Sequence, residues 1–188
     1  MKPPPLPEET LRRVLRVARF NGLSVVIIAG LGAGLSLVCG DYVGAAAGLV
    51  AAGGGWLELS GRQALRRGDA GGLRRLERAQ GIVLGAILAY ALTRLASFDA
   101  ETAMGGLTPD LRSQLAEAGV DLAAILPLVR LMFYATYGLV ALVTLVYQGG
   151  MVWYYRRQGD AVRRALAARL RPAAPAPGAA EHPEDWVT

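Results

Sequence analysis

The sequence predicts an all-α integral membrane protein, in which four transmembrane helices form a bundle flanked by amphipathic helices. Three observations predict this fold class: a mean hydropathy of +0.34, 24 glycines among 188 residues, and four long stretches without charged side chains. A helix of about 20 apolar residues crosses the hydrocarbon core of a bilayer. Four such spans leave too few residues for a separate soluble domain of ordinary size.

The four predicted spans cover residues 21–40, 42–60, 79–98 and 131–155, within a transmembrane domain of residues 22–155. The first span contains the uncharged stretch SVVIIAGLGAGLSLVC. Gly40-Asp41 is almost the whole link to the second span, so the first two spans must form an antiparallel hairpin. Inside the second span, Gly53-Gly54-Gly55 indicates either a broken segment that lines a cavity or a closely packed stretch of helix.

Helical segments are also expected outside the spans. Residues 1–21 form a cytoplasmic amphipathic segment, because the apolar stripe from Leu11 to Ala18 lies beside arginines and suits a helix on an anionic leaflet. Residues 108–126 form an outer helical segment that Pro127 joins to the fourth span. Residues 156–188 contain a basic helix and a disordered tail, which is either inert or a docking segment for a protein partner.

The distribution of basic residues predicts the orientation of the chain. Most of the 20 basic residues lie in residues 1–21, 61–80 and 156–188, whereas the two other connections are mainly acidic. The positive-inside rule therefore places both termini in the cytoplasm, with anionic inner-leaflet lipids as partners. Arginines greatly outnumber the single lysine, Lys2, which is typical of a GC-rich genome and indicates the inner (plasma) membrane of a bacterium. Because topology accounts for the net charge of +5, we expect no nucleic-acid partner.

The scarcity of histidine and cysteine limits the chemistry that the chain can perform. His182 is the only histidine and Cys39 is the only cysteine. A haem held by two histidines, a Cys/His zinc site and a two-cysteine redox relay each need more such residues. We therefore expect no cofactor, no metal site and no catalytic residue. A lipid-modifying enzyme that uses Glu58 or the arginines remains as the enzymatic alternative.

Four polar residues, one on each span, fall at a similar depth near the predicted inner boundary. They are Asn21, Glu58, Gln80 and Gln148. Ionisable residues at membrane depth are costly and commonly functional, so this layer is a candidate lining of a pore or a ligand site. In the alternative interpretation, Glu58 extends toward the headgroups and pairs with Arg62, one helical turn further on.

A second set of charged residues falls at the predicted outer boundary and forms a candidate charged ring. Its members are Asp41, Arg94, Asp99, Asp121 and Arg130. The two arginines either hold the outer helix through carboxylates or form a positive ring for anions in an oligomer.

Small residues recur four positions apart, as in Gly30/Gly34, Gly44/Gly48 and Gly81/Gly85. Such stripes let helices approach closely in lipid, either within one chain or between copies. None of the spans carries a carboxylate near the middle of the membrane, which proton-coupled transport would require. The expected function is therefore a homo-oligomer that forms a passive channel or pore. The alternative is a non-catalytic accessory or scaffold subunit of a membrane complex.

Overall fold

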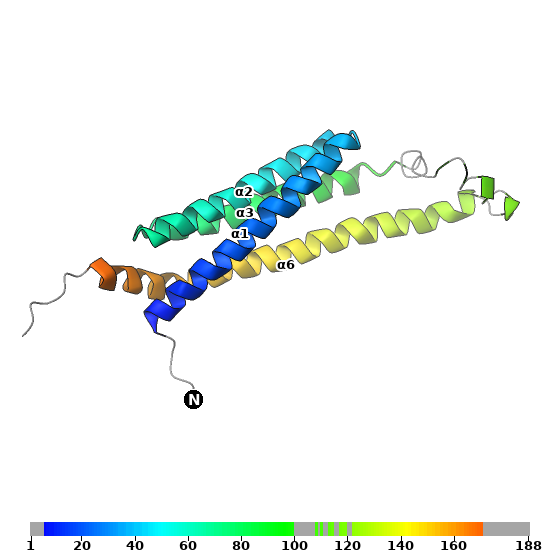
Figure 1. Ribbon diagram of the computed structural model, residues 1–188. Helices are drawn as coiled ribbons and strands as arrows, with labels where there is room; N and C mark the ends of the chain where they lie inside the picture. Colours follow the sequence, from blue (N-terminus) through cyan, green and yellow to red (C-terminus); the bar gives the residue numbers. More distant parts are fainter. Residues whose placement is uncertain are drawn as a thin grey trace, which may run out of the picture.

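Four long α-helices dominate the part of the chain that the structure describes (Figure 1). In the computed structural model these are α1 (Pro7–Val38), α2 (Tyr42–Arg66), α3 (Gly72–Ala96) and α6 (Leu122–Leu170). The structure describes residues 6–99, 108, 110, 113–114, 117–119 and 122–170. This part of the chain contains no strand. Each of the four helices is long and apolar enough to cross a membrane, which agrees with the all-α fold class predicted from the sequence.

The turn between α1 and α2 forms the predicted hairpin. Gly40 has a φ of 75°, which lies in the left-handed region that glycine adopts without steric strain. Asp41 then caps α2, because its Oδ1 accepts a hydrogen bond of 2.9 Å from the Gly44 backbone N–H. The chain thus reverses its direction within residues 39–41.

The arginine-rich N-terminal segment and the first span form a single helix, α1. Pro7 and two glutamates occupy its first turn, as the geometry and the dipole of a helix N-terminus favour. Leu11, Val14 and Ala18 are fully buried in the core that α1 shares with α6. The apolar stripe therefore packs on protein and not on a lipid leaflet, which corrects the interpretation from the sequence. An amphipathic stripe can face either a lipid leaflet or another helix, so the sequence pattern could not distinguish the two.

The glycine triplet in α2 lies in continuous helix. This agrees with the prediction of a closely packed stretch and not with that of a broken segment that lines a cavity. A Cβ atom on Gly53 would meet nothing within 4 Å. A Cβ on Gly54 would lie 2.7 Å from Val83 Cγ2 of α3, and one on Gly55 would lie 2.9 Å from the Gly22 carbonyl oxygen of α1. Gly54 and Gly55 therefore let α2 approach both of its neighbours closely.

Helix α6 is much longer than the fourth span that was expected. Its 49 residues correspond to about 73 Å and join the end of the predicted outer segment, the fourth span and the basic helix that follows. Pro127 lies inside this helix, near its beginning, and not at a joint between two helices. In the predicted outer segment 108–126, residues 110, 113–114 and 117 are helical, residues 118–119 form a turn, and residues 122–126 already belong to α6. The rest of that segment except residue 108, and the predicted tail from residue 172 onward, lie outside the described residues.

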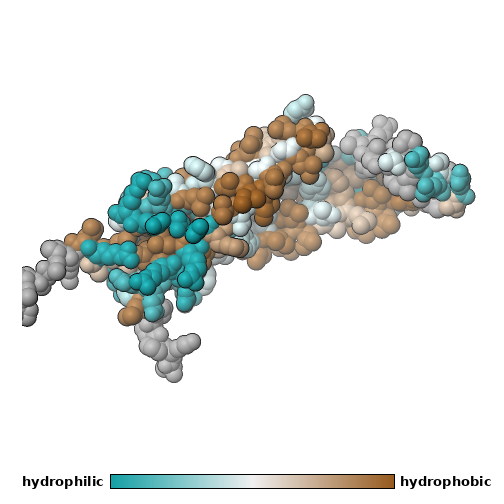
Figure 2. All heavy atoms as spheres, viewed as in Figure 1, coloured by the Kyte–Doolittle hydropathy of each residue, from teal (hydrophilic) through white to brown (hydrophobic). Residues whose placement is uncertain are grey.

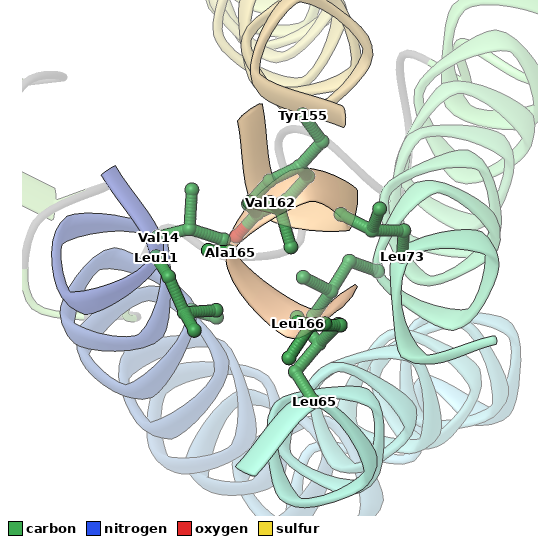
Figure 3. Close-up of a cluster of buried hydrophobic side chains, with 10 residues drawn as sticks. Leu11, Val14, Leu65, Leu73, Tyr155, Val162, Ala165 and Leu166 are labelled. Carbon is green, nitrogen blue, oxygen red and sulfur yellow. The ribbon is translucent and has the colours of Figure 1, made fainter. Parts of the chain in front are cut away.

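The hydrophobic core lies at the end of the bundle where α1 begins, α2 turns into α3 and α6 ends. We call this the basic end, because hydrophilic side chains surround it in Figure 2 and most arginines of the chain lie there. All four helices contribute side chains that point toward one centre in Figure 3. The largest contributors are Leu11, Val14, Leu65, Leu73, Leu76, Tyr155, Val162 and Leu166.

Helices α1 and α6 lie close together at the basic end and diverge toward the opposite end (Figure 1). In that half of the molecule α1 packs on α2, and α6 packs on α3, where the rings of Phe98 and Phe133 are 5.0 Å apart. A hollow of about 200 Å³ lies between α1, α2 and α3, and Gly32, Gly48 and Tyr90 are among its lining residues. Along the spans, exposed apolar side chains form the brown surface in the middle of Figure 2.

The two adjacent glycines Gly53 and Gly54 give a matched test of this packing. We expect Gly54→Ala to reduce the free energy of unfolding by about 1–3 kcal/mol, because its methyl group would press on the stiff Val83 side chain and on the Ala79 carbonyl. Gly53→Ala adds a methyl group in open space, and we expect it to be neutral or to stabilise the helix by up to about 1 kcal/mol. Equilibrium unfolding in bicelles measures both. Equal effects of the two substitutions would contradict the assigned packing.

Candidate functional site

A buried group of polar side chains connects all four helices directly above the hydrophobic core. Asn21 comes from α1, Glu58 from α2 and Gln80 from α3, at the points where these helices converge. The exposed fractions of their side chains are 4%, 1% and 0%. Helix α6 adds Tyr147, which is exposed, and the buried residues Gln148 and Tyr155, which lie two turns apart. We call the whole set the polar cluster, which comprises Asn21, Glu58, Gln80, Tyr147, Gln148 and Tyr155.

The Glu58 carboxylate is the centre of the polar cluster. Its Oε1 accepts a hydrogen bond of 2.5 Å from the Tyr155 hydroxyl, and its Oε2 accepts one of 2.6 Å from Asn21 Nδ2. Asn21 Nδ2 also approaches Gln80 Oε1 at 3.5 Å, and Asn21 Oδ1 accepts a hydrogen bond of 2.8 Å from the Tyr147 hydroxyl. Hydrogen bonds this short are typical of charge-assisted pairs. The cluster therefore links α1, α2, α3 and α6 through one carboxyl group.

Two amide groups of the polar cluster keep free hydrogen-bonding capacity. Gln80 Nε2 is a buried donor and Gln148 Oε1 is a buried acceptor, and neither has a partner among the described residues. The exposed fraction of Gln148 is 4%. Buried polar atoms of this kind are uncommon, since each loses the hydrogen bonds it would make to water. The polar cluster is therefore not fully hydrogen-bonded among the described residues.

The structure brings together three of the four predicted inner residues and also buries the fourth. Asn21, Glu58 and Gln80 share hydrogen bonds, whereas Gln148 lies beside Tyr147 in the chain and makes no bond to the other three. The alternative pairing of Glu58 with Arg62 is wrong. Glu58 points into the bundle, and Arg62 Nε instead donates to the Leu15 carbonyl oxygen at 3.0 Å.

Sequence reasoning missed the two tyrosines that complete the polar cluster. Tyr155 lies near the predicted inner boundary, where amphipathic rings are common, so its position in the sequence gives no sign of a buried partner. In the structure Tyr155 is fully buried and donates to Glu58. The spacing of seven residues between Gln148 and Tyr155 places both on one face of α6, which is the signal that could have identified Tyr155.

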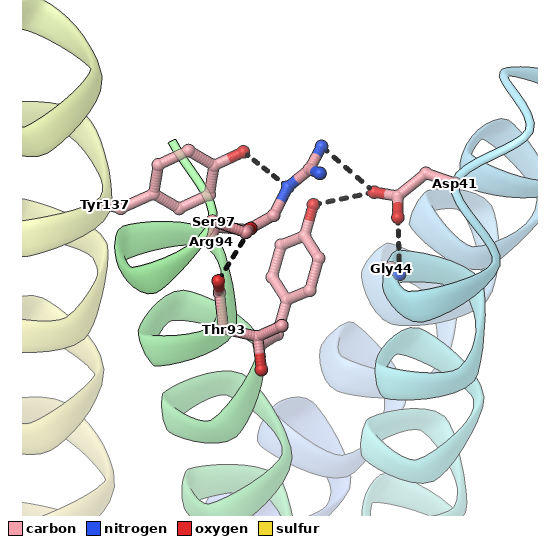
Figure 4. A network of polar contacts seen from close by, with 7 residues as sticks. Asp41, Gly44, Thr93, Arg94, Ser97 and Tyr137 are labelled. Atoms are coloured by element: carbon pink, nitrogen blue, oxygen red, sulfur yellow. Dashed lines mark hydrogen bonds and ion pairs between the residues drawn. The ribbon is translucent and has the colours of Figure 1, made fainter. Parts of the chain in front are cut away.

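A second polar network lies at the opposite end of the bundle (Figure 4). The Asp41 carboxylate accepts hydrogen bonds from the Gly44 N–H at 2.9 Å and the Tyr90 hydroxyl at 2.8 Å. Arg94 Nη2 lies 3.5 Å from the same carboxylate, and Arg94 Nε donates to the Tyr137 hydroxyl at 3.4 Å. The hydrogen bond from Gly44, with the help of Tyr90 and Arg94, lowers the pKa of Asp41 against the opposing effect of burial.

The structure shows the contacts of two of the predicted outer residues, Arg94 and Arg130. Arg94 pairs with Asp41 of the α1–α2 turn. The Arg130 guanidinium lies 5.2 Å from the centre of the Phe98 ring, a cation–π contact. Asp99 directly follows α3 and its turn, and Asp121 lies outside the described residues. Arg94 therefore joins three helices within one chain, which supports a structural role for this residue.

The acidity of Asp41 gives a testable pH dependence. Because its pKa is lowered in the folded state, Asp41 stabilises the fold above its ordinary pKa, and this contribution is lost as the pH falls through the folded value. We expect the free energy of unfolding to fall between about pH 5 and pH 3, and this fall to be smaller in Asp41→Asn. Tyr90→Phe, which removes one of the hydrogen bonds to Asp41, should reduce the fall less than Asp41→Asn does. Parallel profiles for Asp41→Asn and the wild-type protein would contradict this assignment.

No family model, curated protein or solved structure matches this chain. Among the described residues, no group of three or more histidine, cysteine, aspartate or glutamate side chains is arranged to hold a metal ion. The function must therefore be argued from the polar cluster, the network around Asp41 and the faces that the helices leave uncovered.

Proposed function

We propose that the protein is a non-enzymatic, self-associating membrane protein that acts as a structural subunit of a membrane assembly. In this proposal the chain crosses the bilayer four times, and both termini and the basic end face the cytoplasm. The observation that carries it is the contrast between two groups of small residues. One group packs inside the chain, whereas the other faces outward with no protein atoms against it.

The inward group accounts for the packing of the bundle. Cβ atoms on Gly44, Gly48, Gly54 and Gly55 would each approach other atoms to within 3 Å. These glycines therefore serve contacts within the chain.

The outward group consists of Gly30 and Gly34 on α1 and Gly81 and Gly85 on α3. A Cβ on any of these four would meet nothing within 4 Å. Each pair is spaced four residues apart, so each forms a flat patch on one helix face. In lipid, such patches favour close approach of another helix, because van der Waals contact and not hydrophobic burial drives association.

Helix α6 offers a further uncovered surface. None of the residues in its most apolar stretch is buried inside the chain. Lipid can solvate such a helix, but it also leaves a long apolar face for a second copy or another membrane helix. This supports an assembling subunit more strongly than a self-contained enzyme.

A passive conduit, as expected from the sequence, is the second candidate. The observation that favours it is the hollow between α1, α2 and α3, which lies between the Asp41 network and the polar cluster. The hydrophobic core around Leu65, Leu76 and Tyr155 closes the interior at the basic end. Conduction through one chain would therefore require α1 and α6 to separate there, and current across a planar bilayer decides whether this happens.

Self-association through α3 can be tested with substitutions that the fold itself should tolerate. We expect Gly81→Leu/Gly85→Leu to weaken self-association at least about tenfold, because the leucines hold the partner helix away. Gly53→Leu/Gly150→Leu is the control, since these glycines also face open space but form no shared stripe. Energy transfer between labelled copies in bicelles measures the association. A wild-type protein that stays monomeric at high protein-to-lipid ratio would refute the proposal.

The single cysteine provides a natural test of the orientation. Cys39 is exposed at the α1–α2 turn, so a membrane-impermeant maleimide should label it from outside intact cells. In the variant Cys39→Ala/Arg67→Cys the thiol lies in the α2–α3 turn, and labelling should require permeabilised cells. Labelling of both thiols from the same side would contradict the proposed topology.

A further inference from the structure

A concave pocket of about 620 Å³ lies at the basic end, between the beginning of α3 and the last part of α6. Its charged lining consists of Arg74 and Glu77 from α3 and of Arg156 and Arg163 from α6. Gly71 and Gly159, which have no side chains, leave the space between these groups open. Three arginines and one glutamate give this lining a net charge of +2.

The positive charge of the pocket is only partly neutralised by the protein. Arg156 Nε lies 3.6 Å from Glu77 Oε2, and Arg163 Nη2 lies 3.1 Å from Asp160 Oδ1. Arg74 forms no ion pair with any residue in the part of the chain that the structure describes. The N-terminus of α3, next to Gly71, adds its partial positive charge to the same side. An anion with several oxygen atoms would therefore be attracted between α3 and α6.

The pocket lies beside a surface suited to the boundary of a bilayer. Trp153 is exposed one turn before Arg156, and the Arg157 guanidinium lies 5.1 Å from the centre of its ring. Tryptophan and arginine in contact are typical of the headgroup level. On the face of α6 that leads from Arg156 into the span come Val152, Gly149 and Leu145, at intervals of three or four residues. A Cβ on Gly149 would meet nothing within 4 Å, Leu145 is exposed and Val152 is half-buried, so most of this strip is uncovered.

We propose that this pocket binds the phosphate headgroup of an anionic phospholipid, whose acyl chains lie along the Val152, Gly149 and Leu145 face of α6. Arginine suits this role because its guanidinium donates two parallel hydrogen bonds to phosphate oxygens. Basic pockets between membrane helices on the cytoplasmic side are favourable sites for anionic headgroups. The volume exceeds what a bare phosphate ion needs, and the adjoining apolar strip gives a lipid an advantage over a soluble phosphate. The inference rests on the proposed membrane insertion but not on self-association.

The test is a titration of the purified full-length protein with phosphatidylglycerol, followed by native mass spectrometry. We expect at least one phosphatidylglycerol to be retained by the wild-type protein. Removing one arginine near an anionic surface weakens binding about fivefold, so Arg74→Gln/Arg163→Gln should bind about 25-fold more weakly. The control is Arg67→Gln/Arg164→Gln, which removes the same charge outside the pocket lining and should change binding less than threefold.

Three results would overturn the proposal. They are equal losses in the two double variants, phosphatidylcholine binding as tightly as phosphatidylglycerol, and displacement of the lipid by an equimolar amount of glycerol phosphate. Circular dichroism verifies that the variants are folded. If the double variant does not fold, the single substitution Arg74→Gln, at an exposed and unpaired residue, should give the fivefold loss by itself. The native mass spectra also report the number of protein copies, so a monomer with bound lipid would support the site while contradicting self-association.

Discussion

The hydrogen bonds of the Glu58 carboxyl group are the constraint on which the rest of the structure depends. A carboxyl group buried among apolar helices is strongly unfavourable unless hydrogen bonds replace its lost hydration. Tyr155 and Asn21 supply them from α6 and α1, at distances of 2.5 and 2.6 Å. In the proposed membrane setting, helices slide past one another with little change in apolar contact, so a polar contact of this kind determines their register. The polar cluster thereby sets the height of all four helices relative to one another.

The remaining architecture follows from where the helices converge. Below the polar cluster, at the basic end, leucine side chains from four helices close the interior. Above it α1 and α6 diverge, and Arg94 connects the far end across three helices through its contacts with Asp41 and Tyr137. The inward glycines keep α2 in close contact with α1 and α3, which leaves the outward faces of α1, α3 and α6 for lipid or for other helices. The surfaces proposed for assembly and for lipid binding thus do not compete with the internal contacts.

The number and approximate position of the helices could be predicted from the sequence, because uncharged stretches and a Gly-Asp turn are local signals. The inner polar residues could be predicted as a layer for the same reason, since depth in a membrane follows from distance along a span. Partners across the bundle could not be predicted. Arg62 was expected to pair with Glu58 because it follows one turn later, but the two side chains leave α2 in different directions. Tyr155 was indistinguishable from a boundary aromatic, and the stripe at Leu11 was equally suited to lipid or to α6, because local pattern does not specify which helix lies opposite.

The central claim is that the contact between Glu58 and Tyr155 couples α2 to α6. A double-mutant cycle with Glu58→Met, Tyr155→Phe and the combination, measured by reversible unfolding in bicelles, tests it directly. We expect a coupling energy of about 1–2 kcal/mol, since the hydrogen bond involves a buried carboxyl group. Effects that add to within about 0.3 kcal/mol would show that the two side chains do not interact and would contradict this account.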